Sequence, residues 1–325
     1  MKFIRILSVL LPPFLLGLGA CTFDDDGEFF PITSQAFFLL GADEGTNRRF
    51  VRIEGDQVTE NVGTQWGVSQ EQVGDFYLDE EILWIGDVTQ KRLIKIDLED
   101  SEDQESIDLG QLTPHFLQAG DRHVLLSDTL SNQIGFLHKR RMDLVVRTLE
   151  EQPGIAAYRS GKFYLQIGDS SVSIFQEQSF SETDKFDLGG PIKSIQIDPS
   201  TTFTYVYFLN EELMGVRIDF NTNGLSGFSI PNGVEKILHS TIDTPRFDKE
   251  STGLATLFSD GIFRLEALSL GQVEDVSVDF FENQVYIRQL GQWIRRDVRT
   301  GEQLELGSLT GNFYRSAFYR DFIGN

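Results

Sequence analysis

The sequence predicts an all-β fold built from one repeated unit, and three observations support this. From Phe37 onward the chain consists of short runs rich in Val, Ile, Phe, Tyr and Leu, separated by Gly, Asp, Asn and Ser. This pattern is typical of strands joined by turns. No long stretch carries the 3.6-residue apolar period of a helix. The runs also recur at a nearly constant spacing, which indicates that one structural unit is repeated.

The repeated unit is an apolar strand, an Asp or Asn residue, a short turn, and a second strand that alternates apolar and polar residues. Its clearest copies are residues 82–87 with 93–97, 124–128 with 134–137, 163–169 with 172–175, and 205–210 with 216–219. Alternation with a period of two is the signature of a strand with one face in a core. Each unit is therefore expected to bury its faces against its neighbours.

The Asp or Asn residue of each unit serves as a marker for counting the copies. The markers are Asp43, Asp87, Asp128, Asp169, Asn210 and Asp260, followed by a divergent last member at Gly291. Their successive spacings are 44, 41, 41, 41, 50 and 31 residues. An insertion at residues 241–246 and a shortened outer strand at residues 268–270 would account for the two irregular values. A period of about 40 residues with four strands per unit predicts a seven-bladed β-propeller.

Further strands complete the four-stranded antiparallel blades. Inner strands are expected at residues 76–78, 116–117, 155–158, 192–197 and 276–278, and an outer strand at 106–109. The first unit has no inner strand before Phe37, whereas residues 313–318 are left over after the last unit. We expect this C-terminal segment to lie beside the strand that starts at Phe37 and to close the ring, because closure removes exposed sheet edges.

Residues 293–304, Trp-Ile-Arg-Arg-Asp-Val-Arg-Thr-Gly-Glu-Gln-Leu, resemble the end of a repeat in bacterial quinoprotein-like and YVTN-type propellers. In those families an aspartate and a Thr-Gly turn link the last two strands of a blade. Residues 216–224 are similar more loosely, with Asn223 where the Thr would be. The resemblance covers two of the seven units, and it implies the fold rather than an activity.

The first twenty residues have the layout of a secretory signal. Lys2 and Arg5 precede an apolar run at residues 6–18, and small residues follow at 19 and 20. The run is shorter than the about 20 residues that a membrane-spanning helix needs. Residues 18–21, Leu-Gly-Ala-Cys, resemble the lipobox of bacterial lipoproteins. This resemblance implies cleavage before Cys21 and a covalent lipid on Cys21, which is the only cysteine of the chain.

The predicted organisation is a signal peptide at residues 1–20, a lipidated acidic tether at 21–36 and a single propeller domain at 37–325. Acidic residues follow Cys21 closely, at positions 24, 25, 26 and 28. Such a stretch is a solvated tether, or alternatively resembles the surface-export tag of lipoproteins in some Gram-negative groups. The expected location is the cell envelope, lipid-anchored at the outer membrane, on its periplasmic or its surface side.

The formal net charge of −22 excludes one class of partner. Removal of the signal takes away two cationic residues and no acid, so the remaining chain carries about −24. A body this acidic repels phosphate backbones, and a nucleic-acid partner is not expected. The body is expected to be a monomer.

The marker residues are the candidate site. A propeller would place Asp87, Asp128, Asp169 and Asp260 on one face, at the same end of each second strand. As structural residues, their carboxylates would cap their own turns by accepting backbone N–H groups. As a binding site, they would form an acidic rim that attracts cations or a basic partner.

Motifs for catalysis are missing from the sequence. There is no Gly-x-Ser-x-Gly elbow, His-Glu-x-x-His pair or phosphate loop. The four histidines, His115, His123, His138 and His239, have no metal-ligand spacing. Trp84 lies in a strand centre and is expected in the core. We expect neither a metal nor a cofactor other than the lipid.

Three functions remain open at this point. The first is a non-catalytic scaffold that binds a protein or peptide, as the resemblance to periplasmic scaffold propellers implies. The second is a calcium-dependent lactonase-like or quinoprotein-like enzyme. The third is a surface adhesin or glycan-binding lipoprotein.

Overall fold

The computed structural model describes residues 32–42, 48–55, 57–100, 102–197, 203–209, 213–229, 234–238, 246–249, 253–257, 263–266, 275–279, 284–297, 300–310 and 312–322. These residues form 28 β-strands and two short 3₁₀ helices, η1 (Val62–Trp66) and η2 (Gln70–Gln72). The strands assemble into seven four-stranded sheets. The predicted all-β class of four-stranded antiparallel sheets is confirmed.

The sheets are numbered here in chain order, with their strands given from first to fourth. The first sheet is β28 (Asn312–Phe322), β1 (Ile32–Ala42), β2 (Arg48–Glu54) and β3 (Gln57–Glu60). The second is β4 (Val73–Asp79), β5 (Ile82–Asp87), β6 (Arg92–Asp97) and β7 (Gln104–Asp108). The third is β8 (Phe116–Ala119), β9 (His123–Asp128), β10 (Gln133–His138) and β11 (Leu144–Thr148). The fourth is β12 (Pro153–Arg159), β13 (Lys162–Ile167), β14 (Ser171–Gln176) and β15 (Glu182–Asp187).

The last three sheets follow the same order. The fifth is β16 (Ile192–Ile197), β17 (Phe203–Leu209), β18 (Leu213–Asp219) and β19 (Leu225–Ser229). The sixth is β20 (Val234–Leu238), β21 (Arg246–Lys249), β22 (Gly253–Leu257) and β23 (Phe263–Glu266). The seventh is β24 (Asp275–Asp279), β25 (Gln284–Gln289), β26 (Gln292–Asp297) and β27 (Gln303–Thr310).

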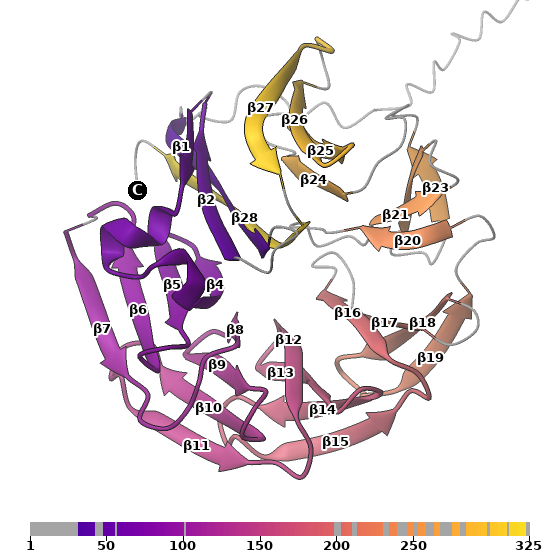
Figure 1. Cartoon of the computed structure of the whole chain (residues 1–325). Helices are drawn as coiled ribbons and strands as arrows, with labels where there is room; N and C mark the ends of the chain where they lie inside the picture. The colour runs from indigo at the N-terminus through magenta and orange to yellow at the C-terminus, as the bar shows by residue number, and fades with distance from the viewer. Residues whose placement is uncertain are drawn as a thin grey trace, which may run out of the picture.

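The sheets are arranged around a common centre, with the first strand of each sheet innermost (Figure 1). The innermost strands contact one another in sequence: β28 contacts β4, β4 contacts β8, β8 contacts β12, and β12 contacts β16. Outer strands such as β7, β11 and β15 lie at the periphery (Figure 1). The first five sheets therefore lie side by side in chain order, as expected for a repeat architecture.

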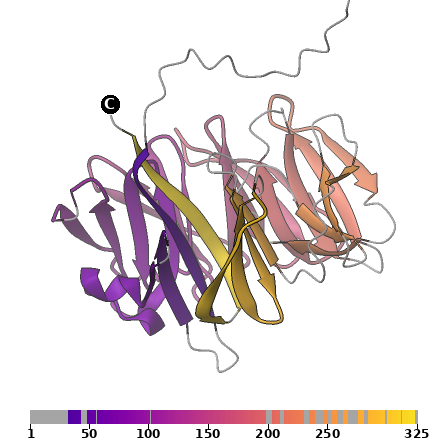
Figure 2. The same ribbon diagram turned by 90° about the horizontal axis from the view of Figure 1, so that it is seen from above.

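The first sheet joins the two ends of the described chain. β28 pairs antiparallel with β1, and Phe37 lies opposite Phe318 in the register. Figure 2 shows the C-terminal strand running beside the N-terminal one. The predicted pairing of residues 313–318 with the strand containing Phe37 is confirmed. β1 itself begins at Ile32, within the segment that the sequence assigned to the tether.

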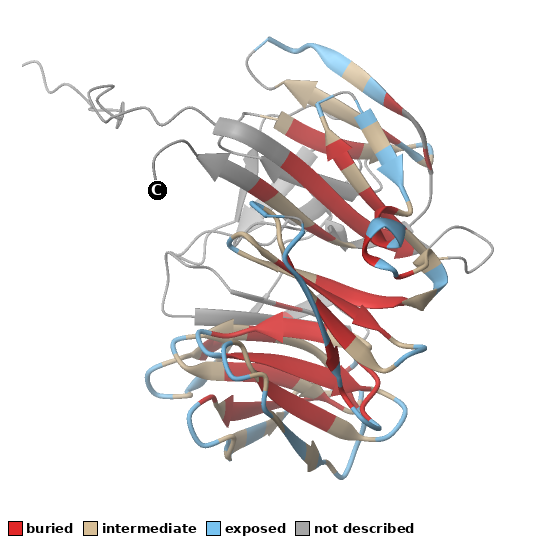
Figure 3. Cartoon of the chain, turned by 90° about the vertical axis from the view of Figure 1, so that its left-hand side faces the viewer, coloured by how far each residue is buried: buried red, intermediate tan, exposed pale blue. Residues whose placement is uncertain are grey.

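The core lies between the sheets. Phe38 and Phe50 of the first sheet pack against Phe76 of the second, with ring centroids 4.9–6.2 Å apart. Similar apolar clusters join the second sheet to the third and the third to the fourth. Trp84 is buried, as predicted. Figure 3 shows buried residues concentrated on the inner and middle strands and exposed residues on turns and outer strands.

The two 3₁₀ helices form the connection between the first and second sheets. Trp66 of η1 is buried in the cluster between these sheets. Within the described residues, no helix is long and apolar enough to span a bilayer.

Candidate functional site

Two of the four marker carboxylates cap the turn between the second and third strands of their sheets. We call the end of the molecule that carries these turns the marker rim. Asp87 is completely buried, and its Oδ1 accepts the backbone N–H groups of Thr89 (3.0 Å) and Gln90 (2.9 Å). Its Oδ2 accepts Arg92 Nε at 3.0 Å, and Arg92 Nη2 also donates to the carbonyl of Gly67 at 2.8 Å. Asp87 therefore fixes its turn and links it to the η1 connection.

Asp128 plays the same part in the third sheet. Its Oδ1 accepts the N–H groups of Leu130 (2.9 Å) and Ser131 (3.2 Å), and its Oδ2 accepts that of Thr113 (2.9 Å). Burial raises the pKa of Asp128, but the hydrogen bonds from Ser131, Thr113 and Leu130 outweigh it and hold this pKa below its usual value. The carboxylate thus fixes both its own turn and the chain entering the sheet.

His115 lies beside this carboxylate without forming an ion pair. Its Nδ1 accepts the N–H of Thr129 at 3.2 Å, so this nitrogen carries no proton. Burial lowers the pKa of His115 although Asp128 opposes the shift. The 3.5 Å approach of Nδ1 to Asp128 Oδ1 is therefore a contact of a neutral ring.

The third marker, Asp169, does not cap its turn, and the expectation that it does is wrong. The register places Ile167, and not Asp169, at the position that Asp87 and Asp128 occupy in their sheets. The turn after Ile167 spans three residues, 168–170, against four in the other two sheets. Asp169 is exposed, and among the described residues none donates a hydrogen bond to its carboxylate. Asp169 therefore lies two residues beyond the position equivalent to Asp87 and Asp128, although all three are spaced 41 residues apart in the sequence.

The fourth marker, Asp260, lies outside the described residues, as do Cys21, Asp43 and Asn210. The described strands of its sheet nearest to it in the chain are β22, which ends at Leu257, and β23, which begins at Phe263.

A second set of caps holds the turns between third and fourth strands, at the rim opposite the marker rim. Asp297 ends β26, and its Oδ1 accepts the N–H of Thr300 at 2.8 Å while its carbonyl accepts that of Gly301. Asp219 does the same after β18, accepting from Asn221 and Thr222. The aspartate and Thr-Gly turn implied by the resemblance is therefore present at Asp297.

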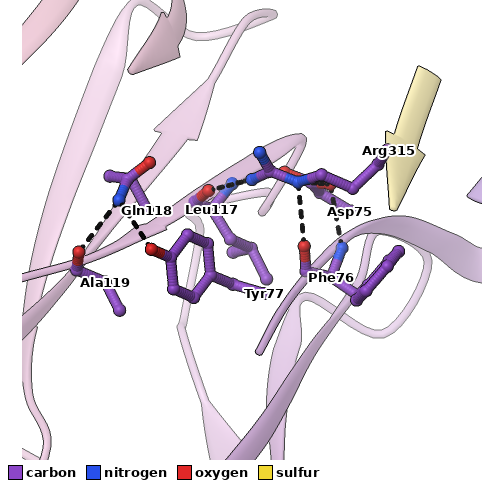
Figure 4. A network of polar contacts seen from close by, with 7 residues as sticks. All are labelled: Asp75, Phe76, Tyr77, Leu117, Gln118, Ala119 and Arg315. Atoms are coloured by element: carbon purple, nitrogen blue, oxygen red, sulfur yellow. Dashed lines mark hydrogen bonds and ion pairs between the residues drawn. The ribbon is translucent and has the colours of Figure 1, made fainter. Parts of the chain in front are cut away.

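A buried ion pair joins three innermost strands. Asp75 on β4 accepts Arg315 Nε at 3.1 Å through Oδ1 and Arg315 Nη2 at 2.9 Å through Oδ2. Arg315 comes from β28 and also donates to the carbonyls of Phe76 and Leu117. Figure 4 shows the guanidinium lying between β4 and the strand that carries Leu117. Burial raises the pKa of Asp75, and the charge of Arg315 with the N–H groups of Leu117 and Phe76 opposes that rise.

Arg315 also packs on the ring of Tyr77, with its Cζ 5.5 Å from the ring centroid. The hydroxyl of Tyr77 accepts Gln118 Nε2 at 3.1 Å, and the same amide donates to the carbonyl of Ala119 at 2.9 Å (Figure 4). The network therefore fastens the C-terminal strand to the second and third sheets. The sequence analysis did not identify it, because its partners are 240 residues apart.

A second buried carboxylate, Glu177, ties the fourth sheet to the third at the rim opposite the marker rim. Its Oε1 accepts the backbone N–H groups of Arg122 (2.8 Å) and His123 (2.9 Å), and its Oε2 accepts the hydroxyl of Tyr158 (2.7 Å). Burial and this bond raise the pKa of Tyr158. A Cβ at Gly120 would lie 2.7 Å from Glu177 Oε1, so the close approach requires glycine there.

The marker rim carries two strongly exposed leucines. Leu130 lies on the β9–β10 turn and is 78% exposed, and Leu290 lies on the β25–β26 turn and is 86% exposed. Because all sheets alternate strand direction in the same order, these two turns lie at the same end of the molecule.

No group of three or more His, Cys, Asp or Glu side chains in the described part of the chain is placed to hold a metal ion.

No family model matches this chain, and no curated protein matches it. Solved structures resemble it in fold. The β-propeller domain of Cps50 (Swd1) from Myceliophteria thermophila has a TM-score of 0.55 at 9% identity, covering 82% of this chain and 96% of that one. AztD from Citrobacter koseri has a TM-score of 0.53 at 9% identity, covering 89% and 98%. A chain of the mitotic checkpoint complex has a TM-score of 0.54 at 11% identity, covering 88% and 94%. At these identities the similarity shows the fold alone: the body is a β-propeller.

Proposed function

We propose that this chain is a lipid-anchored, non-catalytic scaffold of the cell envelope that binds a protein or peptide partner. Its body is a closed ring of seven blades, of a type similar to quinoprotein-like and YVTN-type propellers. The seven sheets and the pairing of β28 with β1 support the blade count and the closure. The anchor is the lipid on Cys21, and residues 22–31 connect it to the first strand at the outer membrane.

The observation that carries the binding role is the exposure of Leu130 and Leu290 on one rim. The turn of Leu130 is rigid, because Asp128 Oδ1 accepts the N–H of Leu130 itself at 2.9 Å. A rigid turn loses little conformational freedom when a partner covers it, so more of the contact energy appears as affinity. Leucine burial contributes about 1.5–3 kcal/mol per side chain, enough to anchor a contact.

Site-specific cross-linking in intact cells tests the scaffold. A photoreactive residue replaces Leu130 in the full anchored chain, and a second variant carries it at Val145, an exposed apolar residue of the outer strand β11. A scaffold that uses the marker rim gives a discrete protein adduct from position 130 that is missing from position 145. The same adducts from both positions, or none from 130, would count against the proposal.

A further inference from the structure

The outer strand of the third sheet, β11, presents an apolar edge. Among the described residues β11 pairs with β10 only, and its neighbouring residues Val145 and Val146 are 39% and 45% exposed. Figure 1 shows β11 at the periphery of the molecule. Open strand edges invite pairing with another chain, and proteins usually block them with charged side chains. The outer strands β7 and β15 carry exposed acidic residues, whereas the exposed side chains at the centre of β11 are valines.

The backbone groups at this edge can be assigned from hydrogen bonds at both ends of β11. The carbonyl of Asp143 accepts a backbone N–H of β10 at 3.0 Å, and the N–H of Leu149 donates to the carbonyl just before β10 at 2.8 Å. Backbone groups of successive residues in a strand point to opposite sides. Residues 143, 145, 147 and 149 therefore turn their backbone groups toward β10. Those of Leu144, Val146 and Thr148 point to the open edge.

The charges around β11 form pairs of opposite sign about Val145. Asp143 and Arg147 lie two residues before and after it, and Arg140 and Glu150 lie five residues before and after it. Within the described residues, neither Arg140 nor Arg147 forms an ion pair, and the ion pair of Asp143 is exposed. An antiparallel copy of the same segment would place each of these charges opposite one of the other sign. Opposite charges facing each other across a strand pair are stabilising.

We propose that β11 pairs antiparallel with β11 of a second copy of this chain, with Val145 opposite Val145 on a two-fold axis. Leu144 then lies opposite Val146 of the second copy. The backbone groups of both residues point to the edge, so the two residues exchange N–H···O bonds, and the symmetry repeats these bonds. Asp143 lies opposite Arg147 of the second copy. The sequence predicts a monomeric body, and this pairing departs from that expectation.

The net charge of −22 does not prevent the pairing. At physiological salt, charges on the surface that are more than about 8 Å apart are largely screened. The charges that remain within reach across the interface are those that flank β11, and they attract. A single pair of strands is a small interface, and small interfaces are typical of transient complexes. Covalent capture is therefore the suitable way to detect the pairing.

Disulfide trapping in intact cells tests the pairing, with Val145→Cys in the full chain. The backbone of residue 145 faces β10, so its pair across the axis is not hydrogen-bonded. The two Cα atoms of such a pair lie about 4.5 Å apart, within the range of a disulfide. The matched control is Leu225→Cys on the outer strand β19, where Leu225 is 44% exposed and no such charge pairs surround it. The unmodified chain, whose only cysteine is Cys21, gives the background.

We expect a mild oxidant to produce a disulfide-linked dimer from Val145→Cys and only background amounts from Leu225→Cys. Adding Arg147→Glu to the Val145→Cys chain should reduce the yield of dimer about fivefold, because two carboxylates then face each other at both ends of the pair. Adding Asp143→Arg as well should restore the yield, since it exchanges the two charges. Thermal unfolding of each variant verifies that the body is folded.

An equal yield of dimer from Val145→Cys and Leu225→Cys, or no dimer from Val145→Cys, would overturn the pairing. Failure of the charge exchange to restore the yield would overturn it too, and so would a disulfide to a different protein. The scaffold proposal is judged separately, because its cross-link is placed at position 130. An adduct from position 145 to a second copy differs from the partner adduct sought there.

Discussion

The guanidinium of Arg315 and the carboxylate of Asp75 meet through two hydrogen bonds, of 3.1 and 2.9 Å, that join the last strand of the chain to the second sheet. Arg315 also reaches the carbonyl of Leu117 in the third sheet. The pairing of β28 with β1 fixes the C-terminal strand by its backbone, and this ion pair fixes it by a side chain. Both connections join residues far apart in the sequence, so the attachment of β28 to the first and second sheets depends on non-local contacts.

The first prediction concerns this ion pair. Arg315→Met should lower the free energy of unfolding by about 3 kcal/mol, because it leaves the Asp75 carboxyl buried without its counter-charge. Urea unfolding measures the loss. Arg141→Met is the control, since Arg141 and Asp143 form an exposed pair, and such a pair contributes less than about 1 kcal/mol. Equal effects of the two substitutions would show that the Arg315 pair is not a structural tie.

The second prediction concerns the C-terminal strand. A chain ending at Leu309 lacks β28, so it exposes the edge of β1 and loses the contact of β28 with β4. We expect the whole molecule to unfold at a lower temperature in one transition, because each sheet is stabilised by its neighbours. A chain ending at Phe322, which retains β28, should unfold like the full chain. If both truncated chains unfold alike, the strand does not close the ring.

The strands and their grouping could be predicted from the sequence, because apolar alternation and turn residues are local signals. The pairing of the N-terminal strand with the C-terminal strand could be predicted by counting the strands in each unit, because the first unit lacks one strand and the chain has one left over after the last unit. Register could not be predicted: Asp169 is spaced like Asp128, yet Ile167 takes the equivalent position. A turn that is one residue shorter does not change the apolar pattern of the strands on either side of it, so the pattern does not reveal the change in register. The Arg315 network could not be predicted either, because nothing local links positions 240 residues apart.

The third prediction is a pH dependence that originates at Asp128. Its pKa in the folded state lies below the ordinary value of 3.8. A lowered pKa means that the carboxylate stabilises the fold above the unfolded-state value, and that this contribution is lost as the pH falls through the folded-state pKa. Wild type should therefore lose more stability than Asp128→Asn as the pH falls below about 4. Urea midpoints at pH 6 and pH 3 provide the comparison, and parallel losses in both proteins would contradict it.

The fourth prediction concerns the proposed lipid anchor at Cys21. Cys21→Ala should move the protein from the membrane fraction to the soluble fraction and abolish its labelling by radioactive fatty acid. Each buried methylene of an acyl chain contributes about 0.8 kcal/mol to the free energy of membrane binding, so loss of the acyl chains removes most of the membrane affinity. The melting temperature of the body should not change. Recovery of the variant in the membrane at the wild-type level would exclude the lipoprotein assignment.

The last prediction separates the two true turn caps from the false one. Asp87→Ala and Asp128→Ala should each lower the free energy of unfolding by about 0.5–2 kcal/mol, by analogy with helix caps, because each leaves backbone N–H groups without an acceptor. The two losses should add, since the residues lie in different sheets and share no partner. Asp169→Ala is the matched control at the same sequence spacing, and its exposed carboxylate accepts no hydrogen bond from the described residues. Its unfolding free energy should stay within about 0.5 kcal/mol of wild type. A loss at Asp169 as large as that at Asp128 would mean that the shared spacing, and not the register, identifies the structural caps.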